Sequence, residues 1–313
     1  MRNEAHRDLL KVWLYAIAAV LVAAAVAPWL YNVGAALAEV TQGKQTNGVV
    51  ERMAEVCRRA TLGDYFKGAW LVAGGLLLVP LNGWLKVGRV SDGGQPLRFG
   101  WAGAGDGLTG FCLSLVLVVG LGLALVQSGA FAWPGETPGL AGAARRWLPW
   151  AVGLAAGQEW LFRGLALGVF QRSMGAAAAI SMAALLSAAA GFCWLRAGSL
   201  VVNPESPWAG FELLRLLAKQ VAEPWVLTAG FVPALVFGGL LGYARWRTAS
   251  LWLPVGLHAG WTFANRLFHD FAKPLKGGAT LQDGLLPLVA LILAAVVLHF
   301  ITPRHGAFHY GDD

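Results

Sequence analysis

The segment that decides the fold is WLPWAVGLAAGQEWLFRGLALGVF, residues 147–170. It is long and apolar enough to cross a bilayer, because about 20 residues span the hydrocarbon core. Near its middle, however, it holds a carboxylate, Glu159, and a guanidinium, Arg163. A charged side chain at the centre of a membrane costs about 2.5–3.5 kcal/mol on insertion scales, so such charges are candidates for a function. The segment therefore predicts a transmembrane helix with a charged pair that is a candidate for a functional site.

The composition of the whole chain also indicates an integral membrane protein. Of the 313 residues, 57% are hydrophobic and 13% are charged, and the mean hydropathy is +0.57, whereas about 25% of residues are charged in soluble domains. Eight apolar runs of spanning length lie at residues 12–32, 67–86, 109–130, 147–170, 176–196, 225–244, 250–268 and 283–301. Because these runs are continuously apolar rather than alternating, they predict helices and not barrel strands. The expected fold is all-α, a polytopic membrane bundle of about eight transmembrane helices.

We expect three parts along the chain, namely N-terminal transmembrane helices with an interfacial loop over 1–146, a core over 147–270, and a last transmembrane helix with a tail over 271–313. In the first part, residues 49–60 mix charged and apolar side chains and predict a short amphipathic helix. It lies either in the membrane interface or on a solvated surface. A second helix-like segment, residues 211–217, falls in a polar insertion over 197–224.

The distribution of the basic residues along the chain argues against a nucleic-acid partner. The formal net charge is +7, but the 24 Lys and Arg residues are spread over every loop and form no dense block. They are better explained by topology and by contacts with membrane lipids, and their near-even division between the two sides leaves the orientation undecided. The three cysteines are far apart, so they predict neither a disulfide nor a metal site.

The spacing of the charged pair can be translated into geometry. Glu159 and Arg163 are one helical turn apart on the same face, so they can form an ion pair. Gln158 is offset from Glu159 by about 100° and could present its amide beside the carboxylate. Ion-pair networks also serve purely structural purposes in helix bundles. From the residues alone, a structural pair and a catalytic group both remain open.

One histidine lies well inside an apolar run. It is His258, in LWLPVGLHAGWT at residues 251–262. Such a side chain either packs by hydrogen bonding to a neighbouring helix or serves as a proton carrier or oxyanion donor. Thr262 and Asn265 follow on the same helical face. The three residues predict a polar stripe that faces protein rather than lipid.

Together these segments resemble the CPBP intramembrane proteases, which include the type II CAAX prenyl endopeptidases and the Abi proteins. The resemblance covers residues 147–268 and rests on QEWLFRG at 158–164, on Ser187 and Phe192, and on FGGLLGYARWRTASLWLPVGLHAGW at 237–261. The family pattern is Glu-Glu-x-x-x-Arg, then Phe-x-x-x-His, then His-x-x-x-Asn, each on its own helix. The first Glu and the second-motif His are thought to activate water, and the third motif to stabilise the oxyanion. The resemblance implies a membrane-anchored or prenylated peptide as partner and a place in the bacterial cytoplasmic membrane.

The resemblance also designates the site. The candidate catalytic residues are Glu159, Arg163, His258, Thr262 and Gln158, and the candidate groove residues are Phe162, Phe192, Arg196, Trp261 and Asn265. Three positions depart from the family pattern: Gln158 replaces the first Glu, Arg196 the second-motif His, and Thr262 the Asn. Neither an amide nor a guanidinium can act as a base, whereas a threonine hydroxyl can still donate a hydrogen bond. Loss of a general base costs roughly 10²–10⁴ in rate.

Three functions therefore remain open. The first is an active protease in which Glu159 has become the base, with His258 as its partner or as oxyanion donor. The second is a degenerate member that binds a membrane peptide or lipid without cutting it. The third is a transporter or channel component with Glu159, Arg163 and His258 on an ion or proton path. Because the core offers a single histidine and Glu159 lies beside Arg163, a three-ligand zinc site cannot be assembled, and we expect no metal and no other cofactor.

Overall fold

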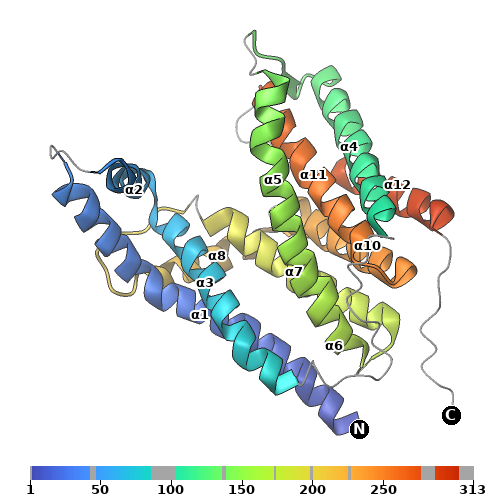
Figure 1. Cartoon of the computed structure of the whole chain (residues 1–313), viewed down its shortest axis with the longest axis horizontal. Helices are drawn as coiled ribbons and strands as arrows, with labels where there is room; N and C mark the ends of the chain where they lie inside the picture. Colours follow the sequence, from blue (N-terminus) through green and yellow to red (C-terminus); the bar gives the residue numbers. More distant parts are fainter. Residues whose placement is uncertain are drawn as a thin grey trace. The chain divides into compact units, whose positions relative to one another are not determined.

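A computed structural model describes residues 2–42, 47–85, 103–135, 139–172, 174–197, 200–224, 227–275 and 286–302. Most of these residues are helical (Figure 1). The elements are α1 (Arg2–Val40), α2 (Gly48–Arg59), α3 (Leu62–Leu85), α4 (Ala104–Gln127), β1 (Phe131–Ala132), α5 (Leu140–Glu159), η3 (Trp160–Ala166), α6 (Leu167–Gln171), α7 (Ala176–Ala197), α8 (Ala209–Ala222), η4 (Leu227–Phe231), α10 (Val232–Thr248), α11 (Trp252–Phe271), β2 (Lys273–Pro274) and α12 (Leu286–Ile301). The two short strands pair antiparallel, and η3 and η4 are π-helices.

The predicted all-α membrane fold is confirmed. Within the described residues, each of the eight apolar runs lies mainly on a helix or on consecutive helices, and α5, η3 and α6 together continue without a break over residues 140–171. Among the described residues, three helices are long and apolar enough to cross a membrane by length and composition: α1 over Arg7–Val40, α3 and α4. Two shorter apolar helices are α7 over Ala176–Gly191 and α12. The chain is an integral membrane protein.

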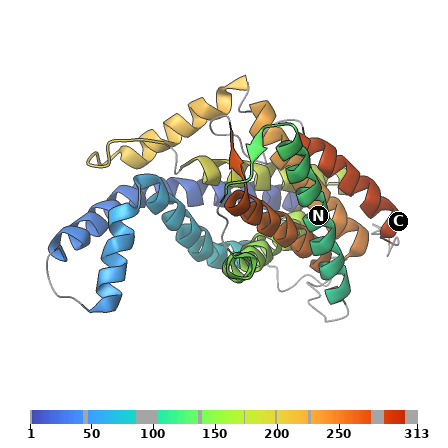
Figure 2. The ribbon, with the colours of Figure 1, turned by 90° about the horizontal axis from the view of Figure 1, so that it is seen from above.

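Contacts divide the chain into two compact units, residues 1–90 with 190–227 and residues 91–189 with 228–313. In the first unit α1 and α3 run side by side, and α2 and α8 both pack against α1 (Figures 1 and 2). The contact between α1 and α8 is close, since a Cβ on Gly210 would stand 1.9 Å from the carbonyl oxygen of Ala24. Backbone-to-backbone packing of this kind needs small residues.

Both short helical segments predicted outside the spanning runs are present in the first unit. Residues 49–60 correspond to α2, whose N-cap Asn47 accepts a hydrogen bond from the backbone N–H of Val49. Such a cap satisfies one of the free N–H groups at a helix start. Residues 211–217 fall inside α8.

Helix α11 is the centre of the second unit, where it packs against α4, α5 and α10. Two glycines bring it close to α4. A Cβ on Gly256 would stand 1.9 Å from the carbonyl oxygen of Gly107, and one on Gly260 would stand 2.4 Å from that of Phe111. Small residues four positions apart allow this approach between membrane helices. His258 lies about half a turn from Gly256, so its side chain leaves α11 on the side away from α4.

Candidate functional site

Three of the predicted site residues meet inside the second unit. Oε1 of Glu159 accepts a hydrogen bond from Nη1 of Arg163 at 3.0 Å and lies 2.7 Å from Nδ1 of His258. The side chains of Glu159, Arg163 and His258 are 0%, 2% and 12% exposed. The ion pair predicted from the spacing is therefore present, and the histidine of α11 joins it.

Arg163 links three helical segments around this carboxylate. Its Nη2 donates to Oγ of Ser187 on α7 at 3.1 Å and to the carbonyl oxygen of Gly238 on α10 at 2.9 Å. A Cβ on Gly238 would stand 3.0 Å from Oγ of Ser187, so the glycine leaves room for both contacts. The planar fork of a guanidinium suits several acceptors at once. Through Arg163, the segments η3, α7 and α10 thus hold the carboxylate of Glu159 in place.

The charged motif lies where α5 continues into a π-helix, since Glu159 is the last residue of α5 and Arg163 lies in η3. In η3 the N–H of Leu167 donates to the carbonyl oxygen of Phe162, five residues earlier. Short π-helical turns inside α-helices occur frequently at functional sites. A π-helix replaces the regular α-helix predicted here, but the predicted contact between Glu159 and Arg163 is still made. Nothing in the composition of this segment predicts the wider turn.

The remaining candidate catalytic residues, Gln158 and Thr262, and the candidate groove residue Asn265 are not hydrogen-bonded to the cluster among the described residues. Gln158 and Thr262 are both half-buried, and neither makes a hydrogen bond with the cluster among the residues that the structure describes. Asn265 is buried, but its Nδ2 donates to the carbonyl oxygen of Trp261 on the same helix at 2.8 Å. Its Oδ1 has no hydrogen-bond partner in the described part of the chain. The amide of Asn265 is therefore bonded within α11.

One aromatic ring lies close to the imidazole of His258, and a second ring packs against the first. The ring of Phe237 lies 5.5 Å from that of His258, edge to face, and 5.2 Å from that of Trp261. Trp261 was a predicted groove residue, whereas Phe237 was not singled out, although the quoted motif begins with it. The predicted groove residues Phe192 and Arg196 belong to α7, but their side chains lie outside the described residues.

The last predicted groove residue lies within the charged motif itself. Phe162 is buried, and its ring centre is 5.9 Å from Cζ of Arg163. An aromatic ring in this position attracts a guanidinium through its quadrupole. Phe162 thus packs against the ion pair.

The hydrogen bonds determine what the cluster can do chemically. An ionised carboxylate only accepts hydrogen bonds, so we assign to His258 the tautomer in which Nδ1 carries the proton and donates to Glu159. In the neutral ring, Nε2 is then an acceptor, as in other carboxylate-oriented histidines. In the part of the chain that the structure describes, no three His, Cys, Asp or Glu side chains are grouped so that they could hold a metal ion.

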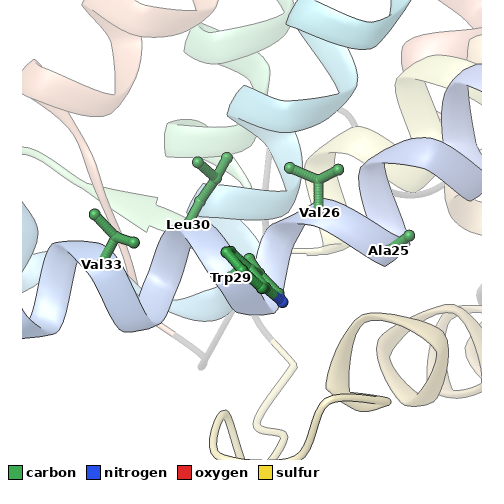
Figure 3. A pocket seen from close by; sticks show the side chains of 5 residues that line it. All are labelled: Ala25, Val26, Trp29, Leu30 and Val33. Atoms are coloured by element: carbon green, nitrogen blue, oxygen red, sulfur yellow. The ribbon is translucent and has the colours of Figure 1, made fainter.

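A surface pocket on α1 has a different character. Its lining consists of Ala25, Val26, Trp29, Leu30 and Val33, all on one helix (Figure 3). Trp29 is 76% exposed, and the lining has no charged side chain. Since α1 is one of the spanning helices, this surface suits lipid chains better than a reaction.

The segment that holds the cluster is similar to a known protein family. The family model described as type II CAAX prenyl endopeptidase Rce1-like matches residues 141–264. The matched segment begins in α5 and ends in α11, so it contains every residue of the cluster. No curated protein and no solved structure matches the chain. The match agrees with the predicted resemblance to the CPBP family, and residues 141–264 of this chain are similar to the Rce1-like type II CAAX prenyl endopeptidases.

Proposed function

We propose that the Rce1-like domain binds a membrane-anchored peptide next to His258 and does not cleave it at the rate of an active endopeptidase. The observation that carries this proposal is the burial of Glu159. Its side chain is 0% exposed, and its Oε1 is engaged by both Arg163 and His258. A carboxylate held in this way serves as a structural anchor, since its side chain is closed off from solvent; its Oε2 has no hydrogen-bond partner in the described part of the chain.

Gln158 and Arg196, which stand where the family pattern has Glu and His, cannot act as the missing base. Gln158 presents an amide, which does not take up a proton near neutral pH, and Arg196 carries a guanidinium, which stays protonated. When members of one catalytic unit are lost together, only residual activity remains. The departures from the family pattern thus support binding without efficient hydrolysis.

The binding part of the proposal rests on what remains accessible. His258 keeps 12% of its side chain exposed and can accept a hydrogen bond at Nε2 from a peptide N–H. The rings of Phe237 and Trp261 beside it provide apolar surface for a side chain or a prenyl group. We propose the bacterial cytoplasmic membrane as the location, in keeping with the family resemblance.

A second candidate function is favoured by one observation, the 2.7 Å contact between Oε1 of Glu159 and Nδ1 of His258. With Nδ1 bonded in this way, Nε2 could take the proton of a water molecule whose oxygen attacks the peptide carbonyl. The proton would then pass to the leaving amine, and Glu159 would stabilise the imidazolium, as in other carboxylate–histidine pairs. In this case the protein is a slow protease with His258 as base.

One experiment separates the two functions. The purified protein is reconstituted in liposomes with a library of membrane-anchored peptides, including prenylated ones, and both retained peptides and cleavage products are identified by mass spectrometry. We expect retention without products for the wild type, and products for the variant Gln158→Glu/Arg196→His. Gly153→Ala is the matched control, because no neighbouring atom lies within 4 Å of the Cβ that it adds.

The possible outcomes have distinct meanings. Cleavage by the wild type that is lost in both Glu159→Gln and His258→Ala would establish the slow protease. Absence of both retention and cleavage would refute both functions. Proton uptake into the same liposomes that depends on Glu159 would instead support the ion path considered from the sequence.

A further inference from the structure

Helix α2 has an exposed apolar edge. Its Val49, Met53 and Val56 are 64%, 54% and 67% exposed. Their spacing places them on one side of the helix, which we call the outer stripe. Ala54, on another side, is fully buried, and α2 packs against α1. One face of α2 therefore holds it to the protein while another presents apolar side chains outward.

The charges of α2 are arranged unevenly around the outer stripe. Arg52 lies next to the stripe, three residues after its first member and four before its last, and is exposed. It makes no ion pair within the described residues. Glu55 points away from the stripe and pairs with Arg58 at 2.7 Å and Arg59 at 2.5 Å. The hydrogen bond from Arg58 and the charge of Arg59 hold the pKa of Glu55 below its usual value, so this carboxylate stays ionised and needs water.

The connectivity of α2 determines its depth. It joins α1, which ends at Val40, to α3, which begins at Leu62, and both are long and apolar enough to span the bilayer. A helix of 12 residues is about 18 Å long and cannot cross a hydrocarbon core of about 30 Å. A short helix between the ends of two spans lies at the membrane surface. The exposed apolar surface of α1 extends toward it, since Val33 and Val40 are 62% and 61% exposed.

We infer that α2 lies flat in the membrane interface, with the outer stripe inserted among the lipids and Arg52 at the level of the phosphates. Of the two alternatives for residues 49–60, this geometry favours the interfacial one. The partner is a phospholipid surface, recognised by apolar insertion and by one basic side chain beside the stripe. The inference concerns the first unit alone and is independent of the function proposed for the Rce1-like domain.

Site-directed spin labelling tests this placement in the full-length protein. The three native cysteines are replaced by alanine, and a nitroxide is attached to Val56→Cys, to Met53→Cys, or to Glu51→Cys as the control on the polar side. Collision rates with oxygen, which partitions into lipid, and with a water-soluble nickel chelate are measured in liposomes. We expect the oxygen-to-nickel ratio at positions 53 and 56 to exceed that at position 51 by roughly threefold or more.

Two results would overturn the inference. If the labels at positions 53 and 56 collide with the nickel chelate as often as the label at position 51, α2 is a solvated surface helix. If the ratio at position 56 is the same in phosphatidylglycerol and in phosphatidylcholine liposomes and is unchanged by Arg52→Gln, the assigned role of Arg52 is wrong. All labelled positions are exposed, so the labels themselves leave the packing of α2 on α1 intact.

Discussion

Glu159→Ala is expected to destabilise the protein by removing the counter-charge of a buried guanidinium. The side chain of Arg163 is 2% exposed, so water cannot replace the lost carboxylate. Breaking a buried ion pair by deleting one partner costs about 3–5 kcal/mol. Arg163 keeps two acceptors, Oγ of Ser187 and the carbonyl oxygen of Gly238, which lower this cost. The hydrogen bond between Glu159 and His258 is lost as well, at about 1 kcal/mol. We therefore expect a loss of about 3–4 kcal/mol in the free energy of unfolding.

The double variant Glu159→Leu/Arg163→Leu gives the prediction its internal control. Replacement of a whole buried ion pair by apolar side chains of similar volume is often neutral or stabilising. The double variant should therefore be more stable than Glu159→Ala, even though it removes both charged groups. Coupling of this kind between contacting residues amounts to about 0.5–3 kcal/mol.

The assay is equilibrium unfolding in mixed detergent micelles, followed by circular dichroism. Glu55→Ala serves as the matched control, because it breaks an exposed ion pair on α2 and should leave the unfolding midpoint unchanged. A loss below about 1 kcal/mol for Glu159→Ala would show that water reaches the guanidinium. Additive losses in the double variant would also refute the reasoning, because the two charges would then act independently.

Two further predictions concern helix packing in the second unit, and both are measured by thermal unfolding in detergent. Gly256→Ala places a Cβ 1.9 Å from the carbonyl oxygen of Gly107 and should lower the stability of the fold by roughly 1–3 kcal/mol. Gly120→Ala on α4, whose added Cβ has no neighbour within 4 Å, should change the stability little. Equal stability of the two variants would contradict the close contact between α4 and α11. Arg245 is 8% exposed, and its Nη1 has no hydrogen-bond partner among the described residues, so Arg245→Met should raise the unfolding temperature. Arg247→Met should lower the unfolding temperature, because Arg247 donates to carbonyl oxygens at the end of α12. If Arg245→Met lowers the unfolding temperature as much as Arg247→Met does, Arg245 has a partner.

The fold could be predicted from the sequence because spanning helices need continuous apolar runs, and such runs are visible without any tertiary information. The ends of the helices were less predictable. The first run was expected over 12–32, whereas α1 extends over Arg2–Val40. Hydropathy marks where the chain lies in hydrocarbon, while the helix continues into the polar regions on both sides. The strands β1 and β2 have two residues each and leave no periodic pattern.

From spacing alone the site was predictable only where it is local, and the pairing of Glu159 with His258 came from the family resemblance. The contact between Glu159 and Arg163 follows from a spacing of four residues on one helix. The partner of Glu159 on α11 is 99 residues away in the sequence, and no periodicity within one helix can indicate such a contact. The glycines at 256 and 260 were a readable signal, since two small residues four apart are typical of close helix pairs in membranes. They explain which side of α11 is left for His258.

The π-helix over Trp160–Ala166 makes the rotational orientation of α6 independent of that of α5, whereas one regular helix would fix the two together. Such a turn is equivalent to one residue inserted into an α-helix, and each residue of an α-helix advances by about 100°. The residues of α5 and those of α6 therefore follow the same spacing but differ in rotational phase. Deletion of one residue within the turn would restore a uniform helix and rotate the buried Leu167, Val169 and Phe170 away from their contacts. The direction of the Glu159 carboxylate and the packing of α6 can thus be adjusted by substitutions in separate parts of one continuous helical segment.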